Sequence, residues 1–247
     1  MIPRADITAW RKYAPWQSDA QVEQDLAISR GLVEIFDDPM LNKKLAFRGG
    51  TAIHKLHLQP PVRYSEDIDL VQIEAGPIGE IFDKIKERLE FLDKPRIRQK
   101  SRNNTMIFSF QSEIPPIIPL KLKVEINCRE HLSCLDLIKI PFKVNSRWFS
   151  GECHITTYLI EELLGSKLRA LYQRKKGRDL FDLWYALIQE KVSIPKIIDA
   201  FYIFLDDSGC SISRKDFLEN MTKKLEDHDF RDDIRGLIQT DVIFDID

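Results

Sequence analysis

The sequence predicts an α+β fold in its first half and a helical domain in its second half. Short segments between residues 44 and 156 alternate apolar and polar residues, which is the pattern of half-buried strands. Residues 18–37 instead place apolar side chains at helical spacing. From Thr157 onward strand patterns nearly vanish, and five segments with helical spacing follow. We therefore expect an α+β domain over residues 1–156 and a helical domain over residues 157–247.

The elements of the first half follow one another closely. The helix 18–37 precedes a short strand that ends at Phe47, and a glycine pair follows. Thr51 is placed to cap a short helix through about Leu58, which a proline pair then stops. Next come a strand over residues 64–72, a helix over residues 78–92, and three strand-like segments between residues 96 and 127.

Composition is that of an ordinary globular protein. The 247 residues are 43% hydrophobic and 31% charged, and the net charge is −2, so no overall basic field indicates a nucleic-acid partner. Four cysteines lack zinc-ligand spacing, which favours reduced thiols. No apolar run approaches the roughly 18 residues that span a bilayer, and the first residues lack a signal peptide's apolar core. We expect a cytoplasmic protein with no membrane partner.

Two aspartates on the strand 64–72 are the most informative chemical signal. Side chains alternate along a strand, so Asp67 and Asp69 project from one face while Ile68 points to the other. Adjacent carboxylates repel each other, and a divalent cation relieves that repulsion. Mg²⁺ prefers carboxylate and phosphate oxygens, so the pair could hold a metal-bound triphosphate. Taken alone, the pattern is more often a solvated strand face.

A third carboxylate comes from the strand 121–127. Leu122, Val124 and Ile126 take one face there, and Glu125 takes the other together with two lysines. If this strand pairs beside the aspartate strand, Glu125 can join the same metal cluster. The alternative is an exposed amphipathic strand.

The glycine pair predicts an anion site. Gly49 and Gly50 allow backbone conformations that other residues avoid, and they let phosphate approach the main chain. Thr51 could add a hydroxyl donor, and Arg48 and Lys55 could contact the phosphates or remain at the surface. Most glycine pairs are simple turns, and the Walker A pattern is absent.

Taken together, these motifs resemble the AbiEii/AbiGii toxin family of nucleotidyltransferases, within the superfamily that shares the DNA polymerase β-like palm. The likeness spans roughly residues 8–190 and depends on four motifs in order: Phe47–Lys55, Arg63–Leu70, Gly165–Arg174 and Arg178–Trp184. The resemblance implies a polymerase β-like palm, with a mixed sheet and flanking helices, followed by a C-terminal helical domain.

The resemblance also implies roles for residues of the second half. It places Lys167 against the nucleotide phosphates and Asp179 and Asp182 in or near the nucleotide site, and it adds Ser65 to the nucleotide-binding residues. On their own physics, Lys167, Asp179 and Asp182 could instead form an interhelical salt-bridge cluster with Arg174 and Arg178. Lys167 and Arg174 share one face of the helix 157–175, and Asp179 and Asp182 lie one turn apart on the next helix.

The resulting hypothesis is a toxin or phage-defence enzyme. It would transfer a nucleoside monophosphate from an NTP to an acceptor hydroxyl, with two Mg²⁺ ions held by Asp67, Asp69 and Glu125. By resemblance the acceptor is RNA, such as the tRNA 3′ end, and a winged-helix antitoxin is encoded alongside. Four alternatives stay open: a non-catalytic nucleotide-binding module on the same fold, an antibiotic-type enzyme with a small-molecule acceptor, an enzyme that modifies a protein hydroxyl, and a metal nuclease.

Overall fold

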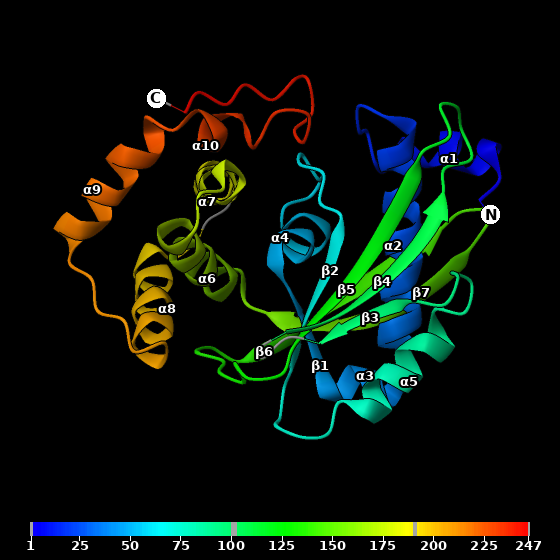
Figure 1. Ribbon diagram of the computed structural model, residues 1–247, viewed down its shortest axis with the longest axis horizontal. Helices are drawn as coiled ribbons and strands as arrows, with labels where there is room; N and C mark the ends of the chain where they lie inside the picture. The colour runs from blue at the N-terminus through cyan, green and yellow to red at the C-terminus, as the bar shows by residue number, and fades with distance from the viewer. Residues whose placement is uncertain (1, 100–102, 190–191, 247) are drawn as a thin grey trace. The chain divides into compact units, whose positions relative to one another are not determined.

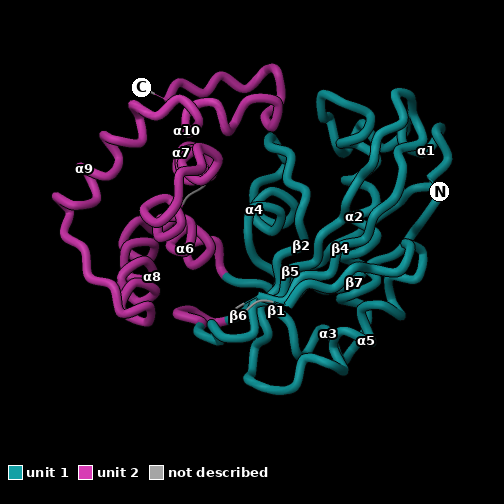
Figure 2. Tube along the Cα trace, in the orientation of Figure 1, with its two compact units in different colours: residues 1–132, 137–158 teal, residues 133–136, 159–247 magenta. Residues whose placement is uncertain are grey.

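The computed structural model describes residues 2–99, 103–189 and 192–246. The chain divides into two compact units, which Figure 2 distinguishes by colour. Unit 1 comprises residues 1–132 and 137–158, and unit 2 comprises residues 133–136 and 159–247. The change falls two residues later than the expected 156/157 boundary, because the last strand of unit 1 continues to Tyr158.

Unit 1 holds all the strands of the described residues. Its elements, shown in Figure 1, are α1 (Arg4–Trp10), α2 (Asp19–Asp37), α3 (Pro39–Lys44), β1 (Leu45–Arg48), α4 (Gly49–Ala52), the π-helix η1 (Ile53–His57), β2 (Asp67–Gln72), α5 (Gly79–Arg88), β3 (Arg96–Gln99), β4 (Asn103–Gln111), β5 (Pro119–Asn127), β6 (Leu137–Asn145) and β7 (Ser150–Tyr158). Unit 2 contains α6 (Ile160–Gln173), α7 (Gly177–Gln189), α8 (Ile194–Asp207), α9 (Arg214–Leu225) and α10 (His228–Asp232).

The strands of the described residues form one seven-stranded mixed sheet in the order β3-β4-β5-β2-β1-β7-β6. Two pairs, β2 with β5 and β1 with β7, are parallel, and the remaining neighbours are antiparallel. The chain therefore combines a mixed α+β unit with a helical unit, which confirms the predicted fold class.

Helix α2 covers one face of this sheet (Figure 1). The helix begins with a capping box, in which the Ser18 side chain accepts from the Gln21 N–H and the Gln21 side chain accepts from the Ser18 N–H. Ile68 and Leu70 of β2 are buried, at 0% and 1% exposed. Because side chains alternate along β2, Asp67 and Asp69 lie on the other face of the sheet.

The hairpin of β6 and β7 is longer than the sequence indicates. Only short extended pieces near residues 142–149 and 153–156 are predicted, yet the two strands pair from Leu137 opposite Tyr158 to Asn145 opposite Ser150. Pro141 lies within β6 and masks the strand signal. A proline is compatible with this position because β6 is an edge strand and needs no ladder bond on its outer side.

The length and apolarity of the helices, and the state of the cysteines, can be read from the described residues. No helix among them is both long enough and apolar enough to cross a membrane. Cys128, Cys134, Cys153 and Cys210 are free thiols in this structure. Burial raises the pKa of Cys134 to about 11 and that of Cys153 to about 12, and nearby carboxylates add to both shifts.

Unit 2 depends on close packing of α6 against α8 at Gly165. A Cβ at Gly165 would meet the Ala200 side chain and the backbone of Ile197 and Phe201 at 2.7 to 3.0 Å. Backbone atoms do not move aside as a flexible side chain does. We therefore expect Gly165→Ala to lower the free energy of unfolding by about 1–3 kcal/mol, as overpacking does.

Urea denaturation of the two proteins would measure this loss. Gly79→Ala is the matched control, since a Cβ there meets nothing within 4 Å and the residue opens helix α5. That control should be neutral or slightly stabilising. An equal effect of both substitutions would contradict the packing argument.

Candidate active site

The three predicted carboxylates of unit 1 lie on one face of the sheet, and two of them, Asp69 and Glu125, share a row across it. In the parallel pairing of β2 with β5, Asp69 is opposite Glu125, and Asp67 is opposite Lys123. On the other side of β2, Asp69 is opposite Arg48 of β1. Directly opposed residues share a face of the sheet, so Asp69 and Glu125 are immediate neighbours. The sequence left the pairing of these two strands as a condition for a shared site, and the sheet shows them paired in parallel.

The glycine bend lies against Asp69. Gly49 has φ +83°, a conformation that side-chain-bearing residues rarely adopt. A Cβ added there would overlap the Asp69 carboxylate, which shows how closely the backbone of the bend approaches that group. Gly50 has no positive φ, but a Cβ there would overlap the Arg63 guanidinium and stand 3.3 Å from Ser65 Oγ. Gly49 is thus required by its backbone conformation and its closeness to Asp69, and Gly50 packs against the residues that precede β2.

Thr51 has a different role from the one expected. It does not cap a helix but lies inside α4, which begins at Gly49. Its hydroxyl contacts Asp67 O at 2.6 Å and Ser65 Oγ at 2.8 Å, and the residue is 1% exposed. The expectation of a hydroxyl donor to phosphate is therefore replaced by a bond that fixes the bend to the start of β2. Ser65 is brought to the bend by the same contact.

Asp67 faces a lysine that the sequence-based site did not include. Lys123 Nζ lies 3.4 Å from Asp67 Oδ1, and that buried oxygen has no hydrogen-bond partner in the described part of the chain. The alternation of strand 121–127 already placed Lys123 on the face of Glu125, so this signal was available. Over the described ranges, no three His, Cys, Asp or Glu side chains are grouped as a finished metal site. The carboxylates are neighbours through strand register, and a cationic lysine partly offsets their charge.

Arg48 flanks the acidic row at its other end. Its Nη1 lies 3.4 Å from Glu130 Oε2, and Glu130 is also held by the Asn127 amide at 3.1 Å. The Arg48 side chain is 27% exposed, so it remains accessible from solvent. The structure therefore brings Arg48, both glycines, Ser65, and the three carboxylates into one region of unit 1.

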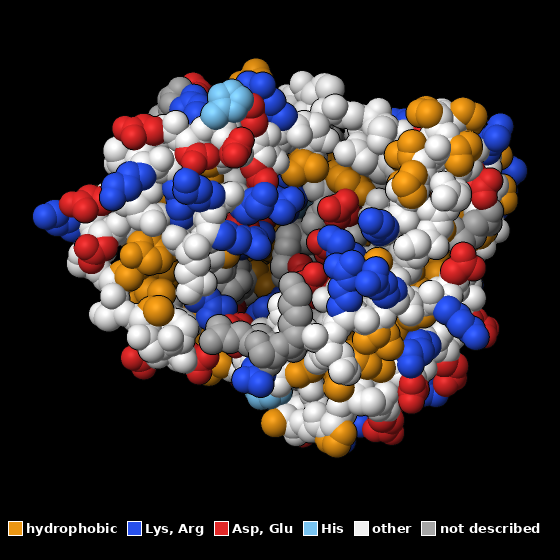
Figure 3. All heavy atoms as spheres, viewed as in Figure 1, with side chains coloured by type: hydrophobic (Ala, Val, Ile, Leu, Met, Phe, Trp, Pro, Cys, Tyr) orange, Lys and Arg blue, Asp and Glu red, His pale blue; other side chains and the backbone are white. Residues whose placement is uncertain are grey.

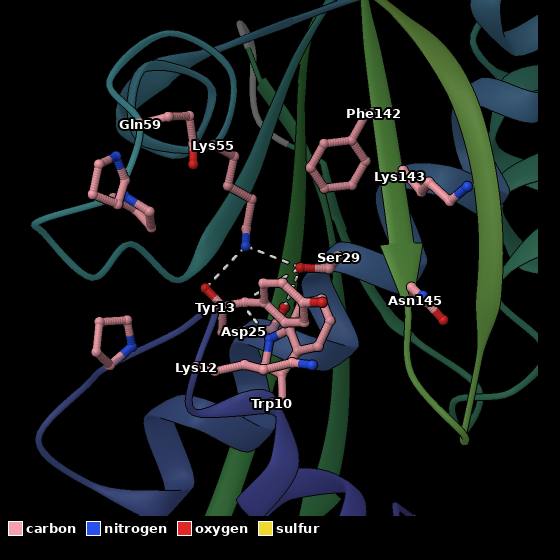
Figure 4. Close-up of a pocket in the computed structure, with 13 residues that line it drawn as sticks. Trp10, Lys12, Tyr13, Asp25, Ser29, Lys55, Gln59, Phe142, Lys143 and Asn145 are labelled. Atoms are coloured by element: carbon pink, nitrogen blue, oxygen red, sulfur yellow. Dashed lines mark hydrogen bonds and ion pairs between the residues drawn. The ribbon is translucent and has the colours of Figure 1, made fainter.

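Lys55 points elsewhere. Figure 4 shows its ammonium reaching Asp25 and Ser29 of α2, at 2.9 and 3.0 Å. The same Asp25 carboxylate accepts from the Trp10 and Trp16 indoles at 2.9 and 3.1 Å. This cluster lines a cavity of about 460 Å³ at which none of the acidic-row residues lies. A buried ion pair holds Lys55 in place, and we correct its expected assignment to the nucleotide site.

Lys167, Asp179 and Asp182 form a buried cluster within unit 2. Lys167 Nζ lies 2.8 Å from Asp179 Oδ1 and 3.0 Å from Asp182 Oδ2, and both carboxylates are fully buried. Arg174 adds two further bonds to Asp179, at 2.7 and 2.9 Å. The interhelical salt-bridge arrangement is therefore present for these four residues. Arg178, expected in the same cluster, pairs with Asp233 instead.

The ionisation of Asp179 follows from these cations. Burial alone would raise the pKa of its carboxyl, but the Lys167 charge and the Arg174 hydrogen bonds outweigh burial and hold the pKa below its ordinary value. Asp179 thus stays ionised at neutral pH although it is buried. Its charge keeps the Lys167 ammonium fixed between α6 and α7.

Comparison with known proteins identifies the family. The family profile described as nucleotidyl transferase AbiEii toxin, type IV TA system, matches residues 30–245. The chain belongs to the AbiEii family. It is therefore a nucleotidyltransferase toxin of a type IV toxin–antitoxin system. The family is the one that the four motifs resemble. No curated protein matches it significantly.

Solved structures show that the AbiEii chain shares its fold with nucleotidyltransferases. MenT4, a nucleotidyltransferase toxin from Mycobacterium tuberculosis, aligns with a TM-score of 0.63 at 17% identity, over 87% of this chain and 77% of MenT4. A putative nucleotidyltransferase from Helicobacter pylori aligns with a TM-score of 0.56 at 17% identity, over 92% and 88%. JHP933 from H. pylori gives 0.52 at 15%, over 85% and 92%. At these identities the likeness concerns the fold alone.

A stability prediction follows for Lys55. Because Lys55→Met removes a cation from a nearly buried carboxylate, it should lower the free energy of unfolding by about 1–3 kcal/mol. NTP affinity should not change, since the side chain is bound to Asp25. Urea denaturation and titration with a fluorescent NTP measure the two effects. Lys43→Met, at an exposed position, serves as the control. If Lys55→Met lost NTP affinity while its stability was unchanged, Lys55 would belong to the nucleotide site after all.

A pH prediction follows for Asp179. Its depressed folded-state pKa stabilises the fold above the unfolded pKa of about 3.9, and this contribution is lost as pH falls through the folded pKa. Asp179→Asn should therefore be less stable than the parent by about 1–3 kcal/mol near pH 7, with the difference shrinking below about pH 4. Chemical denaturation from pH 7 to pH 3 measures it. If the stability difference between Asp179→Asn and the parent stayed constant down to pH 3, the charge of Asp179 would not be what stabilises the fold.

Proposed function

We propose that this AbiEii chain transfers a nucleoside monophosphate from an NTP to an RNA hydroxyl, such as that of a tRNA 3′ end, in a Mg²⁺-dependent reaction. The single observation that carries the proposal is the row Arg48, Asp69 and Glu125, with the glycine bend against it. Family membership supplies the transfer chemistry and the toxin role. The metal, the residues and the acceptor are the parts proposed.

The residues present suit a divalent metal. Asp67 Oδ1 is a buried carboxylate oxygen that accepts no hydrogen bond within the described ranges and has Lys123 Nζ 3.4 Å away, and Asp69 is adjacent to Glu125 across two strands. Mg²⁺ prefers hard oxygen ligands, and carboxylates that leave room for water and substrate phosphate oxygens suit it. Asp67, Asp69 and Glu125 would hold it. Two bound Mg²⁺ ions would acidify the acceptor hydroxyl and stabilise the charge of the departing pyrophosphate.

The chain's own groups would orient the reactants. The backbone of the Gly49–Gly50 bend lets the triphosphate approach Asp69 closely, and Arg48 at the end of the row supplies positive charge. In the transfer step the acceptor oxygen forms a bond to the α-phosphorus, and the bond to the β-phosphate bridging oxygen breaks. Pyrophosphate leaves, and the hydroxyl proton passes to solvent or a neighbouring carboxylate.

Lys167 is proposed as a phosphate contact on family resemblance. In the structure its ammonium is bound to Asp179 and Asp182, so binding phosphate would require one of these pairs to lengthen. Asp179 and Asp182 then act by positioning Lys167. The type IV family implies an antitoxin partner. From the family resemblance, we propose that this partner is a winged-helix protein encoded alongside.

Substitution of the aspartates tests the metal assignment. Asp69→Ala and Asp67→Ala should each reduce label transfer from an α-labelled NTP to RNA by roughly a thousandfold, the scale of lost transition-state charge stabilisation. Stability should be nearly unchanged, because both side chains lie off the core face of β2. Glu66→Ala removes an exposed neighbouring carboxylate as control.

The assay would use each NTP with Mg²⁺ or EDTA, and with total RNA or a small-molecule hydroxyl as acceptor. Full transfer by either aspartate variant would refute the metal assignment. Transfer only to the small molecule would refute the RNA acceptor while leaving nucleotidyl transfer intact. NTP binding without transfer to any acceptor would favour the non-catalytic alternative.

A further inference from the structure

The sheet face that carries the carboxylates continues into basic residues at its β3 edge. Register places Arg98 opposite Thr105, Thr105 opposite Glu125, and Glu125 opposite Asp69. All belong to one row, so Arg98 projects from the same face as the acidic residues. Arg96 occupies the adjacent row, which runs through Ile107 and Lys123 to Asp67.

Lys121 of β5 extends this basic region. It lies two residues before Lys123 and therefore on the same face, and it is opposite Ser109 of β4. Arg96, Arg98 and Lys121 are exposed, and within the described residues none of the three forms an ion pair or a side-chain hydrogen bond. We call these three side chains the β3–β5 basic surface. Figure 3 shows Lys and Arg side chains gathered over β3 to β5 beside acidic ones.

We propose that the β3–β5 basic surface binds the phosphate backbone of the acceptor RNA, an inference that rests on the proposed function. Strands lie about 4.8 Å apart, so Arg98 stands roughly 14 Å along the row from Asp69. A triphosphate held at the glycine bend has its phosphates beside Asp69. Arg98 is too far from that position to contact them. A polynucleotide whose terminal hydroxyl lies at the carboxylates carries further phosphates outward, and these can reach the surface.

Charge sign separates this role from a simpler one. Edge strands often carry charges that prevent pairing with another chain, and β3 is an edge strand. Charges of either sign, on either face of the edge strand, would prevent such pairing equally well. Here both arginines are positive and project on the carboxylate face, in a chain whose net charge is −2. Neutral donors on the same face, Thr105 and Ser109, lie between β3 and β5 and suit phosphate contacts.

The test compares two variants that each remove two positive charges. Arg96→Ala/Arg98→Ala removes the arginines of the β3 edge. Lys139→Ala/Arg147→Ala removes two exposed basic residues from β6 and the turn after it, at the opposite edge of the sheet. The probe is a fluorescein-labelled hairpin RNA with a single-stranded 3′ end, titrated at several salt concentrations. A fluorescent NTP is titrated separately.

The β3 variant should bind RNA on the order of tenfold or more weakly near 0.1 M salt, with a log–log salt slope smaller by about 1.4 for two lost phosphate contacts. Its NTP affinity should equal that of the parent, and its KM for RNA should rise while its KM for NTP does not. Parental affinity and slope in the β3 variant, or an equal loss in the control, would overturn the inference. Failure of RNA binding in the parent, with NTP-dependent transfer to a small hydroxyl retained, would overturn this surface but not nucleotidyl transfer.

Discussion

The arrangement of unit 1 depends on one contact, the approach of the Gly49 backbone to the Asp69 carboxylate across β1 and β2. It requires a positive φ at Gly49, a residue without a side chain, and the antiparallel register that sets Arg48 opposite Asp69. Thr51 then fixes the bend by bonding to Asp67 O. A shift of register by one residue would turn both aspartates into the core that α2 covers, so register and chemistry are inseparable here.

Alternation along single strands was enough to predict which side chains share a face. It identified Asp67 with Asp69 on one strand and Glu125 on another, and the parallel pairing places Glu125 directly beside Asp69. The fold class was also predictable, because the period-2 pattern of strands gives way to helical spacing near Thr157. Alternation along one strand does not predict which residue of another strand will pair with each charged side chain. Lys123 was visible on the correct face, but its pairing with Asp67 depends on register between strands far apart in sequence.

The misplacement of Lys55 has a related cause. Its motif position, a few residues after the glycine bend, suggests a phosphate contact if the segment is one regular helix. The segment instead changes from α-helix to π-helix at Ile53, which rotates the following side chains. Lys55 then meets Asp25, a buried acid that needs a cation. Lys167 shows the same competition, because its spacing is compatible with phosphate binding and with salt bridging, and only the burial of Asp179 and Asp182 decides its present partners.

Membership of the AbiEii family establishes the reaction class, whereas structural neighbours at 15 to 17% identity establish only the fold. The assignment of atoms to roles must therefore come from charge and geometry. Along one row of the sheet the sequence runs from Arg98 through Thr105 to Glu125, Asp69 and Arg48, so that negative charge is concentrated at the centre and positive charge lies at both ends. Such a row opposes a polyanion at its centre unless a cation is present there, and it attracts a polyanion at its ends. A metal-dependent enzyme with two phosphate-bearing substrates needs both properties at once, which neither a solvated strand face nor a simple protected edge would require.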